Sequence, residues 1–222
     1  MPGLPYSGPT VHLIVKMHPL RSQVSECIVT HMPPTASSLS TAEARRETVL
    51  RSAVVVFARS GYLGTPITAV AEDAGISPAY VFKLFPSKEV LFVATLDRCF
   101  SLMRAALARG AQRSADQTPD GLLWAMGGAY AELIADRSLI MLQVHAQSAA
   151  DVPEIGAALR QGLQQITTFV KSRSGASDEA VQRFMAYGQL CHLVVTAALD
   201  AEDAPWAQLL TSGLRHPSPP GS

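Results

Sequence analysis

The sequence predicts an all-α fold of about nine helices, on two observations. Ser or Thr recurs directly before candidate helices, where its oxygen can accept hydrogen bonds from the backbone N–H groups left unpaired at a helix start. Between these starts, apolar residues recur at spacings of three and four, the period of an amphipathic helix, and strand signals are few. We therefore expect helices that pack through their apolar faces along most of the chain.

The first four helix starts fall within residues 40–92. Gly61 and Gly75 follow the last periodic residues of the first two helices, so both are predicted left-handed caps. The segment after the second helix then reads as the turn of a helix-turn-helix, which is a DNA-binding motif. The predicted caps are Ser40 (with Glu43 in an S-x-x-E capping box), Thr65 before Pro66, Ser77 before Pro78, and Ser87.

This segment resembles the N-terminal domain of TetR-type (TetR/AcrR) transcriptional regulators. The resemblance lies in "GY" at residues 61–62, Thr65, "AGIS" at residues 74–77, and "F-x-x-F-x-S-K-E" at residues 82–89. It covers about a quarter of the chain, and the remainder matches only in length and helicity. The resemblance implies a non-enzymatic regulator that binds operator DNA as a homodimer and responds to a ligand held by its C-terminal helices.

The third helix, residues 78–85, is the predicted occupant of the major groove. It holds no Arg, Asn or Gln, so we expect base reading to rest on Tyr80, Lys83 and DNA shape. Phe82 stands where the family commonly has a tyrosine that reaches a phosphate, and Tyr80 stands where a small residue is more usual. The predicted DNA contacts are Arg45, Arg46, Thr65, Thr68, Ser77, Pro78, Ala79, Tyr80, Phe82, Lys83 and Lys88.

The charge of the chain leaves alternatives open. Its net charge is zero, and residues 41–90 carry six basic and five acidic side chains, a weak basic excess for a DNA-binding domain. One alternative is therefore a helical dimer whose DNA binding has degenerated. An all-helical enzyme is a further alternative, although the sequence contains no G-x-S-x-G, G-x-G-x-x-G, P-loop or H-E-x-x-H motif.

Five more helices are predicted in residues 93–215, beyond the fourth, which runs over 88–113. They begin at Pro119 after a predicted Thr118 cap, at Arg137, at Pro153, at Asp178 after a predicted Ser177 cap, and at Pro205. The family resemblance places a ligand cavity and a dimer face among them. The candidate cavity residues are Trp124, Met126, Met141, His145, Phe169, Phe184 and Tyr187, with His145 as the best polar candidate. The candidate dimer-face residues are Val181, Gly188, Cys191, Val195, Ala198, Trp206, Leu209 and Leu210. For each single residue in these two sets, ordinary core packing is at least as good an explanation.

The rest of the sequence bears on the cellular location of the protein and on the two ends of the chain. Three scattered cysteines form no C-x-x-C pair, and no stretch is long and apolar enough to span a bilayer, so we expect a cytoplasmic protein without metal or cofactor. Residues 1–39 are Pro-rich and aperiodic, and we expect them to be disordered. They are either a flexible extension or the product of a start assigned upstream of Met32, and we favour the second. Residues 216–222 are an expected disordered tail.

Overall fold

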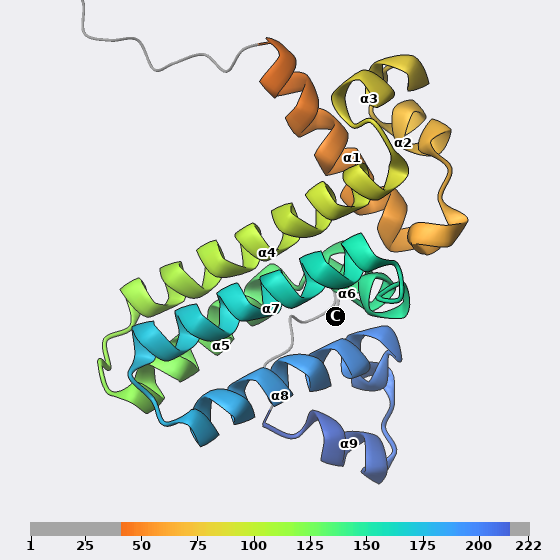
Figure 1. Cartoon of the computed structure of the whole chain (residues 1–222). Helices are drawn as coiled ribbons and strands as arrows, with labels where there is room; N and C mark the ends of the chain where they lie inside the picture. The colour runs from red at the N-terminus through yellow and green to blue at the C-terminus, as the bar shows by residue number, and fades with distance from the viewer. Residues whose placement is uncertain (1–40, 214–222) are drawn as a thin grey trace, which may run out of the picture. The chain divides into compact units, whose positions relative to one another are not determined.

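The computed structural model describes residues 41–213, and within this range the fold is all-α, as predicted (Figure 1). The predicted Ser40 capping box, the arm at 1–39 and the tail at 216–222 lie outside the described residues. The described helices are α1 (Thr41–Gly64), α2 (Ile67–Asp73), α3 (Pro78–Leu84), α4 (Lys88–Arg113), α5 (Pro119–Leu133), α6 (Arg137–Ser148), α7 (Pro153–Ser174), α8 (Asp178–Thr196), the 3-10 helix η1 (Leu199–Ala201) and α9 (Pro205–Thr211).

Four helix starts match the predicted capping chemistry. The side-chain oxygens of Ser77, Ser87, Thr118 and Ser177 each accept a hydrogen bond from a backbone N–H three residues on, over 3.2 Å. Each bond satisfies a donor that the first turn of the helix cannot. The capping residues therefore fix where α3, α4, α5 and α8 begin.

The predicted Thr65 cap is wrong. Pro66 has an extended backbone (φ −78°, ψ 149°) and itself precedes α2, so Thr65 is one residue too early to reach the N–H groups of the first turn. The Thr65 side chain instead turns inward, where its Oγ1 is buried without a hydrogen-bond partner. α2 thus starts without a side-chain cap.

Thr65 and Ser77 give a matched pair of stability predictions. Ser77→Ala removes a formed cap, so we expect it to lower the free energy of unfolding by about 1 kcal/mol. Thr65→Val replaces a buried, unpaired hydroxyl with a methyl group and should leave stability unchanged or slightly raised. Urea denaturation of the two variants measures both effects. A loss for Thr65→Val as large as that for Ser77→Ala would show that the Thr65 hydroxyl has a partner after all.

Helix α1 is kinked at Gly61. The Gly61 backbone (φ 68°, ψ −179°) is not helical, although helical residues continue to Gly64. The positive φ confirms that a glycine is needed here, but the ψ value is extended and not that of a left-handed cap. Gly75 (φ 65°) and Gly175 (φ 63°) also have positive φ after α2 and α7, which fits the glycine preference of helix C-termini.

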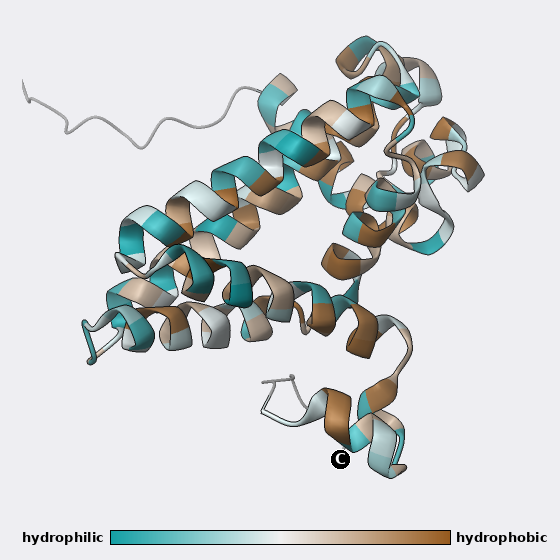
Figure 2. Cartoon of the chain, turned by 60° about the horizontal axis from the view of Figure 1, so that its bottom comes forward, coloured by the Kyte–Doolittle hydropathy of each residue, from teal (hydrophilic) through white to brown (hydrophobic). Residues whose placement is uncertain are grey.

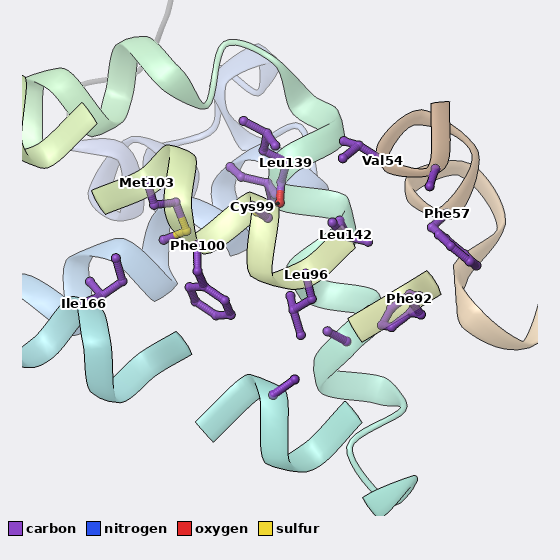
Figure 3. Packing of buried hydrophobic residues seen from close by; sticks show 14 of the residues in the cluster. Val54, Phe57, Phe92, Leu96, Cys99, Phe100, Met103, Leu139, Leu142 and Ile166 are labelled. Carbon is purple, nitrogen blue, oxygen red and sulfur yellow. Dashed lines mark hydrogen bonds between the residues drawn. The ribbon is translucent and has the colours of Figure 1, made fainter. Parts of the chain in front are cut away.

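α4 is the helix around which the others pack. It contacts α1, α5, α6 and α7, and its inward residues include Phe92, Leu96, Phe100 and Met103, which Figure 3 shows as sticks. Phe57 of α1 meets Phe92 edge-on, with ring centroids 4.8 Å apart. Hydrophobic and hydrophilic positions alternate along the long helices (Figure 2), so each presents an apolar face to this core.

Candidate functional site

The helix-turn-helix is closed by backbone hydrogen bonds and a buried anchor. In the turn, the Gly75 and Ile76 N–H groups donate to carbonyl oxygens of α2 over 3.0 Å. Val81 and Phe85 at the inner side of α3 are fully buried, while the residues around them on the outer side remain exposed. α3 is therefore held to the core by one face, and its opposite face is open to a partner.

Most of the residues predicted to contact DNA have exposed side chains. Tyr80 is half-buried, and the Lys83 ammonium lies 6.0 Å from its ring centroid. Phe82 is 48% exposed, so an aromatic ring without a hydroxyl projects from α3. The exposed predicted residues are Arg45, Arg46, Thr68, Ser77, Pro78, Ala79, Phe82 and Lys83.

Two residues that were predicted to contact DNA, Arg46 and Thr65, are engaged or buried within the protein itself. Arg46 donates from Nη1 to the Leu84 carbonyl over 2.9 Å, and its guanidinium lies 4.1 Å from the centroid of Phe85. Arg46 thus ties α1 to the end of α3 and satisfies a carbonyl that the helix leaves free. Thr65 is only 1% exposed, so the prediction that it touches a phosphate is wrong for this conformation.

Lys88 is the first residue of α4 and lies beside the hydrogen-bonded side chains of Tyr62 and Glu89. Its ammonium lies 4.7 Å from the ring centroid of Tyr62, and the Tyr62 hydroxyl donates to the Glu89 carboxylate. That bond lowers the pKa of Glu89 to about 2, and burial, together with the same bond, raises the pKa of Tyr62 to about 12. The pair therefore keeps its protonation states across the physiological range and fixes the start of α4, where Lys88 is half-buried.

A cavity of about 290 Å³ lies among α4, α5, α7 and α8. Trp124, Phe184 and Tyr187, three of the predicted cavity residues, line it. The other four do not. Met126 is fully buried in the core, and Met141, His145 and Phe169 lie away from the cavity lining.

The prediction of His145 as the polar cavity residue is wrong because of the phase of α6. Gln143 lines the cavity, and two residues further on the helix the His145 side chain points to a different neighbour. Its ring packs against Gly61, where an added Cβ would lie 2.8 Å from Nδ1. His145 thus belongs to the contact between α6 and α1.

The buried polar residues of the cavity are Tyr130, Gln143 and His192, none of which is among the predicted cavity residues. The Tyr130 hydroxyl and His192 Nε2 are 3.0 Å apart, and Gln143 Nε2 donates to the Leu139 carbonyl over 3.1 Å. Burial lowers the pKa of His192 to about 4 and raises that of Tyr130. All three side chains are therefore neutral at pH 7.

The lowered pKa of His192 predicts an acid-dependent loss of stability. Because the folded state disfavours protonation, its contribution is complete above the ordinary value of 6.5 and is lost as the pH falls toward about 4. Stability should fall by up to about 1.4 kcal/mol per pH unit in this window. Urea denaturation at pH 7, 6 and 5 should show a smaller fall for His192→Gln, and equal falls would contradict the assignment.

The candidate dimer face is partly core. Val181 and Cys191 are buried within the chain's own fold, so their prediction as free dimer-face residues is wrong. Large apolar side chains do remain exposed on α8 and α9: Leu193 is 50%, Trp206 56% and Leu209 78% exposed. The other candidates are half-buried (Gly188, Val195, Leu210) or exposed (Ala198).

The N-terminal part of the chain is similar in sequence to known transcriptional regulators. Residues 49–95 match the family model "Bacterial regulatory proteins, tetR family". The HTH-type transcriptional regulator RutR of Escherichia coli K12 is 34% identical over 64 residues, which are 29% of this chain and 30% of RutR. The chain thus matches about a third of the length of this curated relative.

Solved structures share the fold over more of the chain. A TetR-family regulator from Agrobacterium tumefaciens superposes with a TM-score of 0.60 at 18% identity, over 77% of this chain and 93% of that one. FadR of Bacillus subtilis, solved in complex with stearoyl-CoA, gives a TM-score of 0.58 at 16% identity, over 76% and 99%.

Residues 41–213 thus form an all-helical protein with an N-terminal helix-turn-helix, followed by helices that line a cavity. The N-terminal part of the chain matches the tetR family model, and its fold superposes on that of a TetR-family regulator of known structure. Within residues 41–213, no helix has both the length and the apolar character needed to cross a bilayer.

Proposed function

We propose that the protein is a ligand-responsive transcriptional repressor of the cytoplasm, which binds palindromic operator DNA as a homodimer and is released by a small apolar or aromatic effector. The observation that carries the proposal is the open face of α3, held from behind by the buried Val81 and Phe85 and flanked by Lys83 and Lys88. Such a helix fits the major groove, and its flanking cations suit phosphates.

The course of α4 supports a coupling between the cavity and the DNA. Lys88 begins this helix beside α3, and Phe100, Met103 and Leu107 on the same helix line the cavity. A ligand that changes the packing around these three residues can therefore shift the start of α4, and with it the spacing of two reading heads in a dimer.

Exposed apolar side chains support the homodimer. Leu193, Trp206 and Leu209 leave apolar surface at α8 and α9, and two-fold dimers are the usual partners of palindromic sites. Size-exclusion chromatography with light scattering should give twice the mass of the chain at micromolar concentration. A monomer under these conditions would count against a dimeric regulator.

Two substitutions separate phosphate contacts from base reading. Lys88→Ala should weaken binding to all DNA sequences by a similar factor and lower the salt slope by about one contact. Tyr80→Ala should instead change the preference among sequences. Arg104→Ala, which removes an exposed charge from α4 away from α3, is the matched control for net charge. Selection from random duplex DNA measures all three, and an unchanged preference in Tyr80→Ala would remove its base-reading role.

A gel shift on the intergenic palindromes beside the gene tests the whole proposal. We expect a shifted band that a cavity ligand abolishes. Failure with every nearby palindrome would favour the alternative of a helical dimer with degenerate DNA binding, to which the absent hydroxyl of Phe82 also points.

A further inference from the structure

The cavity among α4, α5, α7 and α8 has a polar wall without a charge. Tyr130, Gln143 and His192 form this wall, with exposed fractions of 8%, 3% and 5%. The charged residues that line the cavity are Asp120 and Arg183, and both are exposed. The buried end of the cavity is therefore polar and neutral, and its other walls are mostly apolar.

The hydrogen bonds of this wall leave Tyr130 with a spare donor. The hydroxyl lies 3.0 Å from His192 Nε2, while His192 Nδ1 is buried with no partner. If Tyr130 donated to Nε2, Nδ1 would carry the hydrogen and leave a buried N–H unpaired, which proteins rarely tolerate. The favoured tautomer has the hydrogen on Nε2, so His192 donates and the Tyr130 oxygen accepts.

Gln143 is held on the same wall, because its Nε2 donates to the Leu139 carbonyl over 3.1 Å. Nε2 carries two hydrogens, so one remains for a neighbouring acceptor. With the hydrogen of His192 Nε2 directed at the Tyr130 oxygen, the hydrogen of the Tyr130 hydroxyl is free to point into the cavity.

We propose that the cavity binds a neutral, largely apolar molecule with one oxygen acceptor, such as a ketone, and that this acceptor takes the hydrogen of the Tyr130 hydroxyl. This inference rests on the proposed function, because it names the ligand class for the same cavity. A carboxylate is disfavoured, since burial holds the pKa of His192 at about 4 and no cation lies at the buried end. The volume of about 290 Å³ is at the lower end of ligand sites and suits a small molecule.

Three probes of nearly equal shape separate the possibilities. Benzylacetone carries a ketone, hydrocinnamate carries a carboxylate in its place, and isopentylbenzene carries only methyl groups there. Isothermal titration calorimetry with the full chain at pH 7 should show that benzylacetone binds about three- to tenfold more tightly than isopentylbenzene, the value of one net hydrogen bond. Hydrocinnamate should bind more weakly than either, because its charge must be desolvated.

Tyr130→Phe removes the proposed donor and keeps the ring. It should abolish the preference for benzylacetone over isopentylbenzene and leave the affinity for isopentylbenzene nearly unchanged. Tyr62→Phe is the matched control, because Tyr62 is a buried, hydrogen-bonded tyrosine that does not line the cavity. This control should keep the full preference.

The infrared carbonyl stretch of bound benzylacetone tests the same bond in the unmodified chain. We expect it at lower frequency than in heptane, because a hydrogen bond weakens the C=O bond, so the test does not depend on how the variant folds. A stretch at the heptane position, equal affinities for ketone and hydrocarbon, or tighter binding of hydrocinnamate would overturn the inference and leave the ligand cavity in place. Binding of none of the three probes would instead count against the ligand-responsive part of the proposed function as well.

Discussion

Gly61→Ala is expected to lower the free energy of unfolding by about 2–6 kcal/mol. Two costs combine at this position. The backbone (φ 68°, ψ −179°) lies in a region that essentially only glycine adopts, which costs about 1–3 kcal/mol for another residue. The new Cβ would also lie 2.8 Å from His145 Nδ1, and overpacking of this kind costs about 1–3 kcal/mol. Chemical denaturation of the full chain measures the sum.

Gly175→Ala separates the two costs. Gly175 has a similar φ of 63°, but its backbone is left-handed helical and nothing lies within 4 Å of an added Cβ. We expect a loss of only about 1–2 kcal/mol there. Adding His145→Ala to Gly61→Ala should recover the packing part alone, so the pair should be non-additive. Equal losses at both glycines would show that the contact with His145 costs nothing.

Gly162→Ala is expected to cost about 2–3 kcal/mol and to change the ligand cavity. An added Cβ would fall within the van der Waals radius of the Phe100 ring, which crosses α7 at this glycine. Phe100 is 2% exposed and lines the cavity, so a displaced ring alters the cavity wall. Thermal unfolding measures the stability loss, and titration with benzylacetone measures the effect on the cavity.

Phe100→Leu provides the rescue for this variant. Trimming the ring makes room for the new methyl group, so the double variant should be more stable than the sum of the single losses by more than 1 kcal/mol. Additive losses would mean that Phe100 and Gly162 do not constrain each other. Gly188→Ala is the matched control, since Gly188 is also helical and lines the cavity, but its Cβ would meet nothing within 4 Å.

The order and limits of the helices could be predicted from local chemistry. Ser77, Ser87, Thr118 and Ser177 cap their helices within one turn of sequence, so the information needed to place α3, α4, α5 and α8 is local. Thr65 shows where this reasoning fails. Its pattern is the same as that of Ser77, but Pro66 takes the position before the helix and the hydroxyl turns into the core.

The cavity could be predicted only in part, because its wall combines residues that are far apart in sequence. Tyr130 and His192 are separated by 62 positions, and only tertiary packing brings them to 3.0 Å. His145 and Gln143 are two residues apart on α6, yet they contact different parts of the fold. Sequence periodicity tells which residues share a face of a helix, but not which neighbour that face meets.

The exposed face of α3 is easier to predict from sequence than the cavity, because its residues follow one another along a short helix. Val81 and Phe85 are buried on the side that faces the core, so Ala79, Phe82 and Lys83 fall on the exposed side. The hydrogen bond from Arg46 to the Leu84 carbonyl could not be predicted from sequence, because it joins residues 38 positions apart. The partition of the chain into a DNA-binding part at 40–92 and a regulatory part at 93–215 stays a prediction, and α4 runs continuously through that boundary.

In the proposed function, α3 reads DNA for a dimeric, ligand-responsive regulator. The decisive test is selection by the full chain from random duplex DNA, followed by fluorescence anisotropy on the enriched sequence with and without benzylacetone. We expect an inverted repeat, two chains per site, an affinity that falls steeply with salt, and weaker binding when the cavity is occupied. Enrichment of no sequence, or binding that survives the combined replacement of Tyr80, Lys83 and Lys88 by alanine, would contradict it.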